Sequence, residues 1–236
     1  MTPWFAFYTF KPIDLSMDKS REKVSLKIVN WYEINGRKDL PWRKTKNPYK
    51  VLIAELMLQR THAIKQVLPV FNEFIDKYPD IESLSKASIT EIRETIFSLG
   101  LHNTRSRRMK ELATKVKEHF TEIPKQRKDL ISLPGVGEYV ANAVLCMAFD
   151  KPYPMVDSNF GRVLGRVFFG KEEYPPSKNR IWKTASGLLP DKKYKEFNLG
   201  VMDLGALVCT PKNPVHSNCP LSEECMFYKN EGTMDE

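Results

Sequence analysis

Four residues near the C-terminus have the types and the spacing of metal ligands. In the stretch CTPKNPVHSNCPLSEEC, intervals of six, two and five residues separate Cys209, His216, Cys219 and Cys225. Three of the chain's four cysteines lie here, and such clustering is more typical of a metal site in a reducing compartment than of a secreted disulfide framework. The spacing therefore predicts a metal site. For three thiolates and one imidazole alone, zinc is the commoner metal, and iron–sulfur is the alternative.

A second stretch has the pattern of a phosphate-binding turn. DLISLPGVGEYVANAVLCMAF predicts an apolar helix that ends at Leu133, a turn through Gly135 and Gly137, and a second apolar helix. Glycines permit a tight turn, and free amides at a helix N-terminus bind phosphate. We therefore predict backbone contacts to phosphate from Leu133, Gly135, Val136 and Gly137, with a plain interhelical turn as the alternative.

A carboxylate follows this turn in PMVDSNFGRVLGR. Asp157 comes after two apolar residues and before Ser158-Asn159, which is a natural helix start, so its side chain is expected to cap a helix. The same position would bring the carboxylate to the mouth between two lobes, where DNA held by the turn would arrive. We expect Asp157 to serve both purposes.

The elements that must position these residues are almost all helical. Apolar residues recur at intervals of three and four from Arg21 onward, and alternating strand patterns are nearly absent. We predict an all-α protein. The helices are expected from Arg21 to the Gly36 stop, from Pro48 to about residue 61, and over 63–78, 88–98, 103–120, 125–132, 138–149, 159–168, 178–189 and 192–208.

Composition fits a globular protein with a polyanionic partner. The 236 residues are 42% hydrophobic and 28% charged, enough for one core or two small lobes. Lysine and arginine exceed aspartate and glutamate by 37 − 29 = 8, which favours nucleic acid as a partner. No window has the length of a membrane span, and MTPWFAFYTF lacks the features of a secretory signal. We expect a monomer in the cytoplasm or nucleus, without membrane contact.

The combination of LPGVG, a Gly/Pro-rich loop with Asp157 and the cysteine cluster resembles the HhH-GPD superfamily of base-excision DNA glycosylases, the endonuclease III group. The resemblance runs from about Trp31 to Cys225. It implies a six-helix barrel at 48–149 with the helix-hairpin-helix motif at 125–149. It also implies a terminal lobe of 21–47 and 150–236 that carries an iron–sulfur loop at 209–225, with 1–20 as an extension. Double-stranded DNA with a mispaired or damaged base would bind between the lobes, with one nucleotide flipped out.

The same resemblance implies a catalytic set. The Asp at position 157 would stabilise positive charge on the sugar. Bifunctional members have a lysine at the position of Tyr139, whereas archaeal-type thymine–guanine mismatch enzymes have tyrosine, and tyrosine forms no Schiff base. The implied activity is monofunctional removal of thymine or uracil opposite guanine. The alternatives are an adenine glycosylase acting opposite 8-oxoguanine or guanine, which lacks its usual further C-terminal domain, and a non-catalytic DNA-binding protein.

Two further stretches imply contacts to the base and to DNA. AELMLQRT resembles the pocket helix of the family, with Glu55 toward the flipped base and Gln59 and Arg60 near the gap in the duplex. Glu55 alternatively is a solvated carboxylate. GLHNTRSRRMKEL resembles the GLxN loop, and this implies DNA contacts from Leu101, His102 and Asn103.

The positively charged residues near these stretches also suggest contacts to DNA. The basic run Arg105, Arg107, Arg108 and Lys110 is either a solvated face or a set of phosphate contacts. Lys212, inside the cysteine loop, is expected to meet a phosphate.

The resemblance also bears on the metal. The family pattern C-x6-C-x2-C-x5-C holds a [4Fe-4S] cluster, and here His216 occupies the second position. The family resemblance orders the alternatives as a His-ligated [4Fe-4S] cluster, a [3Fe-4S] cluster and Cys3His zinc. Cys146 lies on an apolar helix face and is expected to be a packing residue.

Overall fold

Helices alone build the part of the chain that the structure describes. The structure is a computed structural model that describes residues 15–59, 61, 63–170 and 178–231, and these contain no strand, which confirms the all-α prediction. The α-helices are α1 (Leu15–Asn35), α2 (Pro41–Lys44), α3 (Pro48–Leu58), α4 (Leu68–Lys77), α5 (Ile81–Lys86), α6 (Ile89–Thr95), α7 (His102–His119), α8 (Arg127–Ile131), α9 (Glu138–Phe149), α10 (Ser158–Phe169), α11 (Lys178–Leu188), α12 (Tyr194–Leu207) and α13 (Met226–Glu231). Shorter turns are η1 (Ala63–Val67), η2 (Phe97–Leu99) and η3 (His216–Asn218).

The observed elements differ from the predicted ones mainly at the first helix, over 63–78 and in three short helices. The first helix begins at Leu15, inside the segment expected to be an extension, and the helix expected over 63–78 is a π-turn followed by α4. The short helices α2, α5 and α13 were not predicted. Each has six residues or fewer, too short for a helical period to be visible, although Asp80 and Ser83 form a complete capping box around the first turn of α5.

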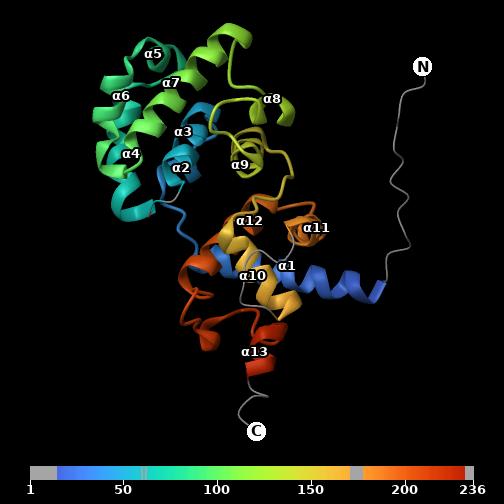
Figure 1. Cartoon of the computed structure of the whole chain (residues 1–236). Helices are drawn as coiled ribbons and strands as arrows, with labels where there is room; N and C mark the ends of the chain where they lie inside the picture. Colours follow the sequence, from blue (N-terminus) through green and yellow to red (C-terminus); the bar gives the residue numbers. More distant parts are fainter. Residues whose placement is uncertain (1–14, 60, 62, 171–177, 232–236) are drawn as a thin grey trace, which may run out of the picture.

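The apolar core consists of two clusters. The first collects side chains mainly of α3, α4, α7 and α9, and the second collects mainly those of α1, α10, α11 and α12. In Figure 1 the first group of helices lies in the upper part of the molecule and the second in the lower part. Leu40 and Trp42, just before α3, pack in the first cluster. Helix α12 joins the two, because Leu199 belongs to the first cluster while Val201 and Leu204 belong to the second.

Two glycines let α12 approach its neighbours closely. A Cβ atom added to Gly200 would lie 2.8 Å from Cγ2 of Ile28 in α1, and one added to Gly205 would lie 2.7 Å from Cβ of Asn159 in α10. The absent side chains therefore allow α1 and α10 to pack directly on the backbone of α12. This packing holds α12 in place against α1 and α10, and α12 contributes residues to the candidate site.

No helix within the described residues has both the length and the apolar character needed to cross a membrane.

Candidate active site and metal-ligand loop

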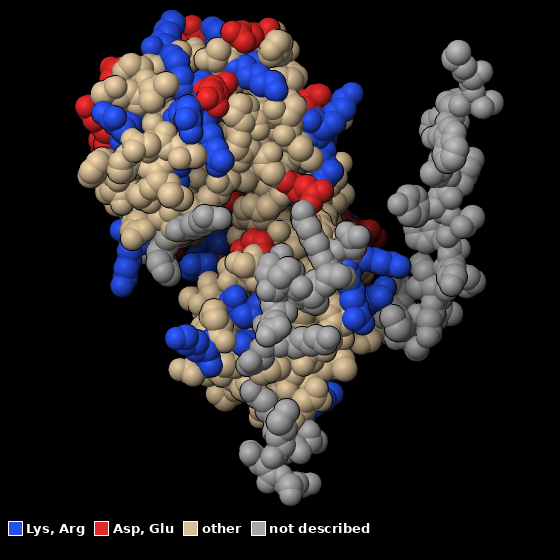
Figure 2. Space-filling model, viewed as in Figure 1, with Lys and Arg blue, Asp and Glu red and all other residues tan. Residues whose placement is uncertain are grey.

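A cavity of about 550 Å³ lies where the two core clusters meet. Its volume is in the usual range for a small-molecule site. Glu55, Tyr139 and Asp157, the three predicted catalytic residues, all line it, so the structure brings them together from α3, α9 and the start of α10. No lysine is among the described residues that line the cavity. In the space-filling view, Lys and Arg side chains lie on both sides of the hollow between the two halves (Figure 2).

Glu55 is a buried carboxyl group, not a solvated one. Helix α3 starts with Pro48 after the Asn47 cap, and seven of the residues that follow Tyr49 bury their side chains, Glu55 among them at 5% exposure. Burial raises the pKa of Glu55 to about 7, although the Tyr139 hydroxyl and the Arg43 charge oppose this shift. Its Oε2 atom has no hydrogen-bond partner. Glu55 therefore offers a proton or a hydrogen bond to whatever enters the cavity.

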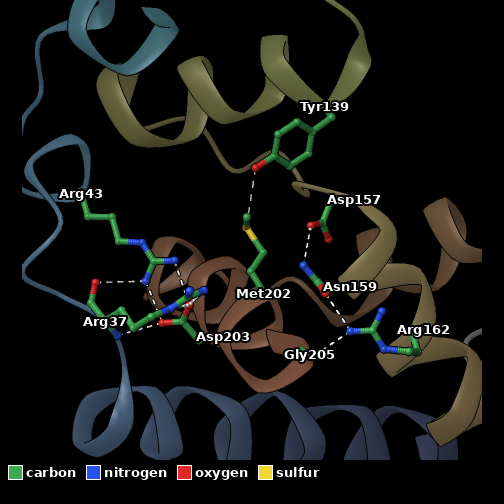
Figure 3. A network of polar contacts seen from close by, with 9 residues as sticks. All are labelled: Arg37, Arg43, Tyr139, Asp157, Asn159, Arg162, Met202, Asp203 and Gly205. Atoms are coloured by element: carbon green, nitrogen blue, oxygen red, sulfur yellow. Dashed lines mark hydrogen bonds and ion pairs between the residues drawn. The ribbon is translucent and has the colours of Figure 1, made fainter. Parts of the chain in front are cut away.

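Asp157 caps α10, as the sequence predicted. Its carboxylate accepts hydrogen bonds from the Phe160 amide at 2.8 Å and from Nδ2 of Asn159 at 3.0 Å (Figure 3). Burial raises the pKa of Asp157, and the two hydrogen bonds together with the Arg162 charge oppose that increase. The carboxyl group is thus partly desolvated, and in its ionised form its electrostatic effect on a nearby cation is stronger than in water.

Tyr139 extends from the first turn of α9, directly after the glycine turn. Its hydroxyl lies 3.8 Å from the sulfur of Met202 in α12 (Figure 3). Burial, reinforced by the charges of Glu55 and Asp157, raises the pKa of Tyr139 well above its usual value. The phenol therefore stays neutral, and it cannot serve as an anionic nucleophile.

A buried ion-pair cluster, which the sequence did not predict, forms another wall of the cavity. Asp203 in α12 is fully buried and accepts hydrogen bonds from Arg43 at 2.7 and 2.9 Å and from Arg37 at 2.5 to 2.8 Å (Figure 3). Burial alone would raise the pKa of Asp203, but the hydrogen bonds and charges of the two arginines lower it overall. The detectable signal was a single aspartate inside the apolar run FNLGVMDLGALVC.

A chain of polar contacts links Asp157 to the cysteine loop. Asn159, which donates to Asp157, accepts from Nη2 of Arg162 at 2.7 Å. The same arginine donates to the carbonyl of Gly205 at 2.6 Å and, through Nε, to the carbonyl of Cys209 at 2.8 Å. The first predicted metal ligand and the candidate catalytic carboxylate are therefore connected through two side chains.

The predicted phosphate-binding turn combines a left-handed glycine with the N-terminus of α9. Gly135 has a φ of +80°, in the left-handed region that favours glycine, and Gly137 is the N-cap of α9 and provides no side-chain cap. Leu133 and Val136 are buried, and their amides donate to the carbonyls of Leu130 and Leu133 at 3.0 and 3.1 Å, so neither amide is free for a phosphate. Nε2 of Gln59 donates to the Gly135 carbonyl at 3.1 Å, which ties the end of α3 to the turn.

The other predicted DNA contacts differ in exposure. Leu101, Asn103 and Lys212 are exposed, whereas His102 is half-buried against Phe97. Arg60 lies outside the described residues.

Two members of the basic run, Arg105 and Lys110, donate to protein carbonyls, so the two interpretations made from the sequence stay open only for Arg107 and Arg108. Arg105 is 7% exposed and donates to the carbonyls of Leu99, Gly100 and Gln59. Lys110 donates to two carbonyls of the α5 C-terminal region. The spacing of the four basic residues in the sequence does not show which of them are buried. Arg107 and Arg108 are exposed and remain available to DNA.

The four predicted metal ligands line one small cavity, together with Arg166. The three thiols form no disulfide, and the His216 ring stacks on Tyr228 with centroids 4.3 Å apart. Burial raises the pKa of Cys219 to about 11, so a metal must displace its proton.

The donors around this cavity do not converge on one point. Within the described residues, no three His, Cys, Asp or Glu side chains are close enough together to hold a single metal ion.

Cys146, the fourth cysteine, is fully buried in the first core cluster, as a packing residue would be.

Comparison with known proteins gives the family. Residues 53–190 match the HhH-GPD superfamily of base excision DNA repair proteins. A thymine/uracil-DNA glycosylase of Pyrobaculum aerophilum is 42% identical over 86% of this chain and 90% of that protein. An adenine DNA glycosylase of Buchnera aphidicola is 39% identical, but the match covers 59% of that protein. The solved structure of a thermostable thymine-DNA glycosylase superposes with a TM-score of 0.85 at 37% identity, over 91% of this chain and 99% of that one. The chain belongs to the HhH-GPD superfamily of base excision DNA repair proteins.

Proposed function

We propose that this protein is a monofunctional DNA glycosylase that removes thymine or uracil mispaired with guanine. The observation that carries the proposal is one cavity that holds Asp157, Tyr139 and Glu55 and has no lysine among its described lining residues. The base must leave the duplex to reach such a cavity, because the glycosidic bond is inaccessible inside the base stack. The similarity to a thymine/uracil-DNA glycosylase along 90% of that protein supports the choice of base.

Asp157 is the group that acts on the sugar. As the bond to the base breaks, positive charge develops at the anomeric carbon, and a carboxylate aimed there stabilises it. Asn159 and the Phe160 amide hold the Asp157 oxygens in one orientation, so little reorganisation is needed during the reaction. Water then completes the hydrolysis on the sugar.

Glu55 and the arginine pair act on the departing base. A pyrimidine leaves as an anion that hydrogen bonds stabilise, and Glu55, with its pKa near 7, is partly protonated at neutral pH and can donate to a carbonyl oxygen. Arg43 and Arg37 add positive charge to the cavity wall, and Asp203 holds them in place.

Strand cleavage requires an amine that this cavity lacks. A bifunctional glycosylase forms a Schiff base between a lysine and the sugar, and the neutral phenol of Tyr139 cannot do this. The proposed enzyme therefore leaves an abasic site in an intact strand.

DNA is proposed to lie across the opening of the cavity. The amides of the glycine turn would bind phosphate, Gln59 and Leu101 would fill the gap left by the flipped base, and Lys212 would add a phosphate contact. We infer that the two core clusters are the two lobes between which the flipped nucleotide enters.

The cysteine loop is proposed to carry a [4Fe-4S] cluster held by Cys209, His216, Cys219 and Cys225. Zinc needs four donors that converge on one ion, whereas in a four-iron cluster each ligand binds a different iron. Membership of the HhH-GPD superfamily favours the cluster, and the four candidate ligands line one cavity. When bound, such a cluster orders the loop. Arg166, which donates to the sulfur of Cys209 at 3.3 Å, would neutralise part of its negative charge.

A panel of duplexes tests the substrate. Each duplex carries one defined pair: T·G, U·G, A·G, A·8-oxoguanine or a matched T·A. We expect release of free thymine and uracil opposite guanine only. Release of adenine from A·8-oxoguanine, with none of thymine, would support the adenine alternative. Binding without any release would support a non-catalytic protein.

A further inference from the structure

An aromatic ring is exposed one turn before the predicted Leu101 contact. Phe97 begins η2, and its side chain is 64% exposed, more than any other aromatic residue in the described part of the chain. Its neighbours Ile96 and Leu99 are buried, at 0% and 6% exposure. The turn is therefore anchored by two aliphatic side chains while it presents a large apolar ring to solvent.

The backbone after Phe97 adopts an unfavourable conformation that keeps a second apolar side chain exposed. Gly100 and Leu101 both have positive φ, at +68° and +51°. A left-handed conformation costs a leucine free energy, and Leu101 gains no burial from it, since its side chain is 57% exposed. Strain that the rest of the fold maintains without a packing gain is typical of functional positions.

Arg105 holds this turn at the rim of the cavity. Its buried guanidinium donates to the Leu99 carbonyl at 2.9 Å and to the Gly100 carbonyl at 3.2 Å. The same group donates to Oγ1 of Thr61 at 2.7 Å and to the carbonyl of Gln59. Because Thr61 and Gln59 line the cavity, the exposed turn lies next to its opening and is fixed relative to it.

The Phe97 ring is also oriented in advance. It stacks on the imidazole of His102, with centroids 4.5 Å apart and an interplanar angle of 29°. One face of the ring is thus occupied by protein while the side chain as a whole remains largely exposed. A held ring with exposed apolar surface is suited to stacking on a nucleobase, since every base has a π-face.

We propose that Phe97 stacks on the base opposite the extruded nucleotide. Gln59 lies between the two DNA-facing segments, because its side chain donates to Gly135 in the glycine turn and its carbonyl accepts from Arg105. With the glycine turn on the phosphates of the strand that carries the extruded nucleotide, the Phe97 turn faces the partner strand across Gln59. This inference rests on the proposed glycosylase function and adds a contact that would make excision depend on the opposing base.

The test compares Phe97→Ala with the native protein on two duplexes. One has uracil opposite guanine, and the other has uracil opposite an abasic analogue, which offers no base to stack on. We expect single-turnover excision from the first duplex to fall about tenfold, the usual effect of losing one base–aromatic stack. Excision from the second should change less than about twofold, and Phe97→Trp should restore the first rate. Leu26→Ala, on α1 with a similar exposure of 58%, is the matched control.

Equal losses on both duplexes, or no loss on either, would overturn the role of Phe97. A second readout separates this role from the proposed function. 2-Aminopurine replaces the opposing base in a duplex with non-cleavable uracil, and its fluorescence should be more strongly quenched by the native protein than by Phe97→Ala. Unchanged quenching in the variant would contradict the stacking contact. If no duplex released uracil with the native protein, the proposed function would fail, and the fluorescence would still decide about Phe97.

Discussion

Asp157 combines a structural and a proposed chemical role in one side chain. It caps α10 through the Phe160 amide, and it lines the cavity with a carboxylate that burial has partly desolvated. Asparagine also caps helices well, so the two roles can be separated by a substitution that removes only the charge.

Asp157→Asn should therefore abolish excision without unfolding the protein or releasing DNA. We expect the single-turnover rate to fall by about a hundredfold or more, as for the loss of a preorganised electrostatic contact. Binding to a T·G duplex, measured by fluorescence anisotropy, should be nearly unchanged. Asp150→Asn, an exposed carboxylate paired with Lys46, is the control. A variant with near-normal turnover would rule out Asp157 as the catalytic carboxylate.

Glu55 makes the stability of the protein depend on pH. The folded state raises its pKa from 4.5 to about 7, so between these values the folded state binds more protons than the unfolded state. Stability should consequently fall as pH rises from about 4.5 to 7, by on the order of 3 kcal/mol. Glu55→Gln removes the titrating group.

Urea unfolding at pH 5 and pH 8 measures this effect. The free energy of unfolding of Glu55→Gln minus that of the native protein should be about 2–3 kcal/mol higher at pH 8 than at pH 5, because only the native protein loses stability as Glu55 ionises. Glu111→Gln, on the exposed side of α7, should show no such difference. The same result for both variants would mean that Glu55 is not held in a desolvated site.

At the scale of elements, the sequence predicted most of the longer helices, but not the short helices and turns between them. The helices near 103–120, 138–149, 159–168 and 192–208 match α7, α9, α10 and α12 within two residues at either end, because each has a long apolar period. The division of 63–78 into a π-turn and α4 depends on local hydrogen bonding that periodicity does not encode. The candidate catalytic residues were identified through their motifs. Arg43, Arg37 and Asp203 were missed, because their pairing joins positions 160 or more residues apart.

The close contact of α12 with α10 gives a prediction about packing. Gly205→Ala would place a Cβ atom 2.7 Å from Cβ of Asn159 and 3.2 Å from its Cα, so the helices must separate. We expect a loss of about 1–3 kcal/mol in the free energy of unfolding, typical of overpacking. Excision should also slow, since Asn159 holds Asp157.

Gly187→Ala provides the matched control in α11. There a Cβ atom would meet only the end of the flexible Arg21 side chain, at 3.3 Å. That substitution should be neutral or stabilise by up to about 1 kcal/mol, because alanine is the better helix former. Equal stability changes for the two variants in thermal unfolding would contradict the close packing of α12 on α10.

At the scale of the whole molecule, the cysteine loop connects α1 to the C-terminal region of the described chain. Lys23 and Lys27 of α1 pair with Glu223 and Glu224 beside Cys225, and Arg162 connects Cys209 to the cavity. A metal bound to this loop would therefore stabilise both the terminal contacts and the support of Asp157.

Metal analysis of anaerobically purified protein tests the loop. We expect about four irons per chain, and His216→Cys should retain the iron and lower the potential of the cluster, because thiolate replaces a neutral ligand. Removal of the iron should weaken DNA binding before it changes the cavity. Stoichiometric zinc with no iron would contradict the cluster and leave the roles of Asp157 and Tyr139 intact.

The central claim is hydrolytic removal of thymine opposite guanine in a cavity without a reactive amine. Mass spectrometry of one single-turnover reaction on a T·G duplex, with borohydride added to a parallel sample, measures both parts directly. We predict that the amount of free thymine equals the amount of full-length strand with one abasic sugar. In the borohydride sample we predict no protein–DNA adduct. A reaction that releases no thymine, or a strand cut without alkali together with a trapped adduct, would contradict the claim.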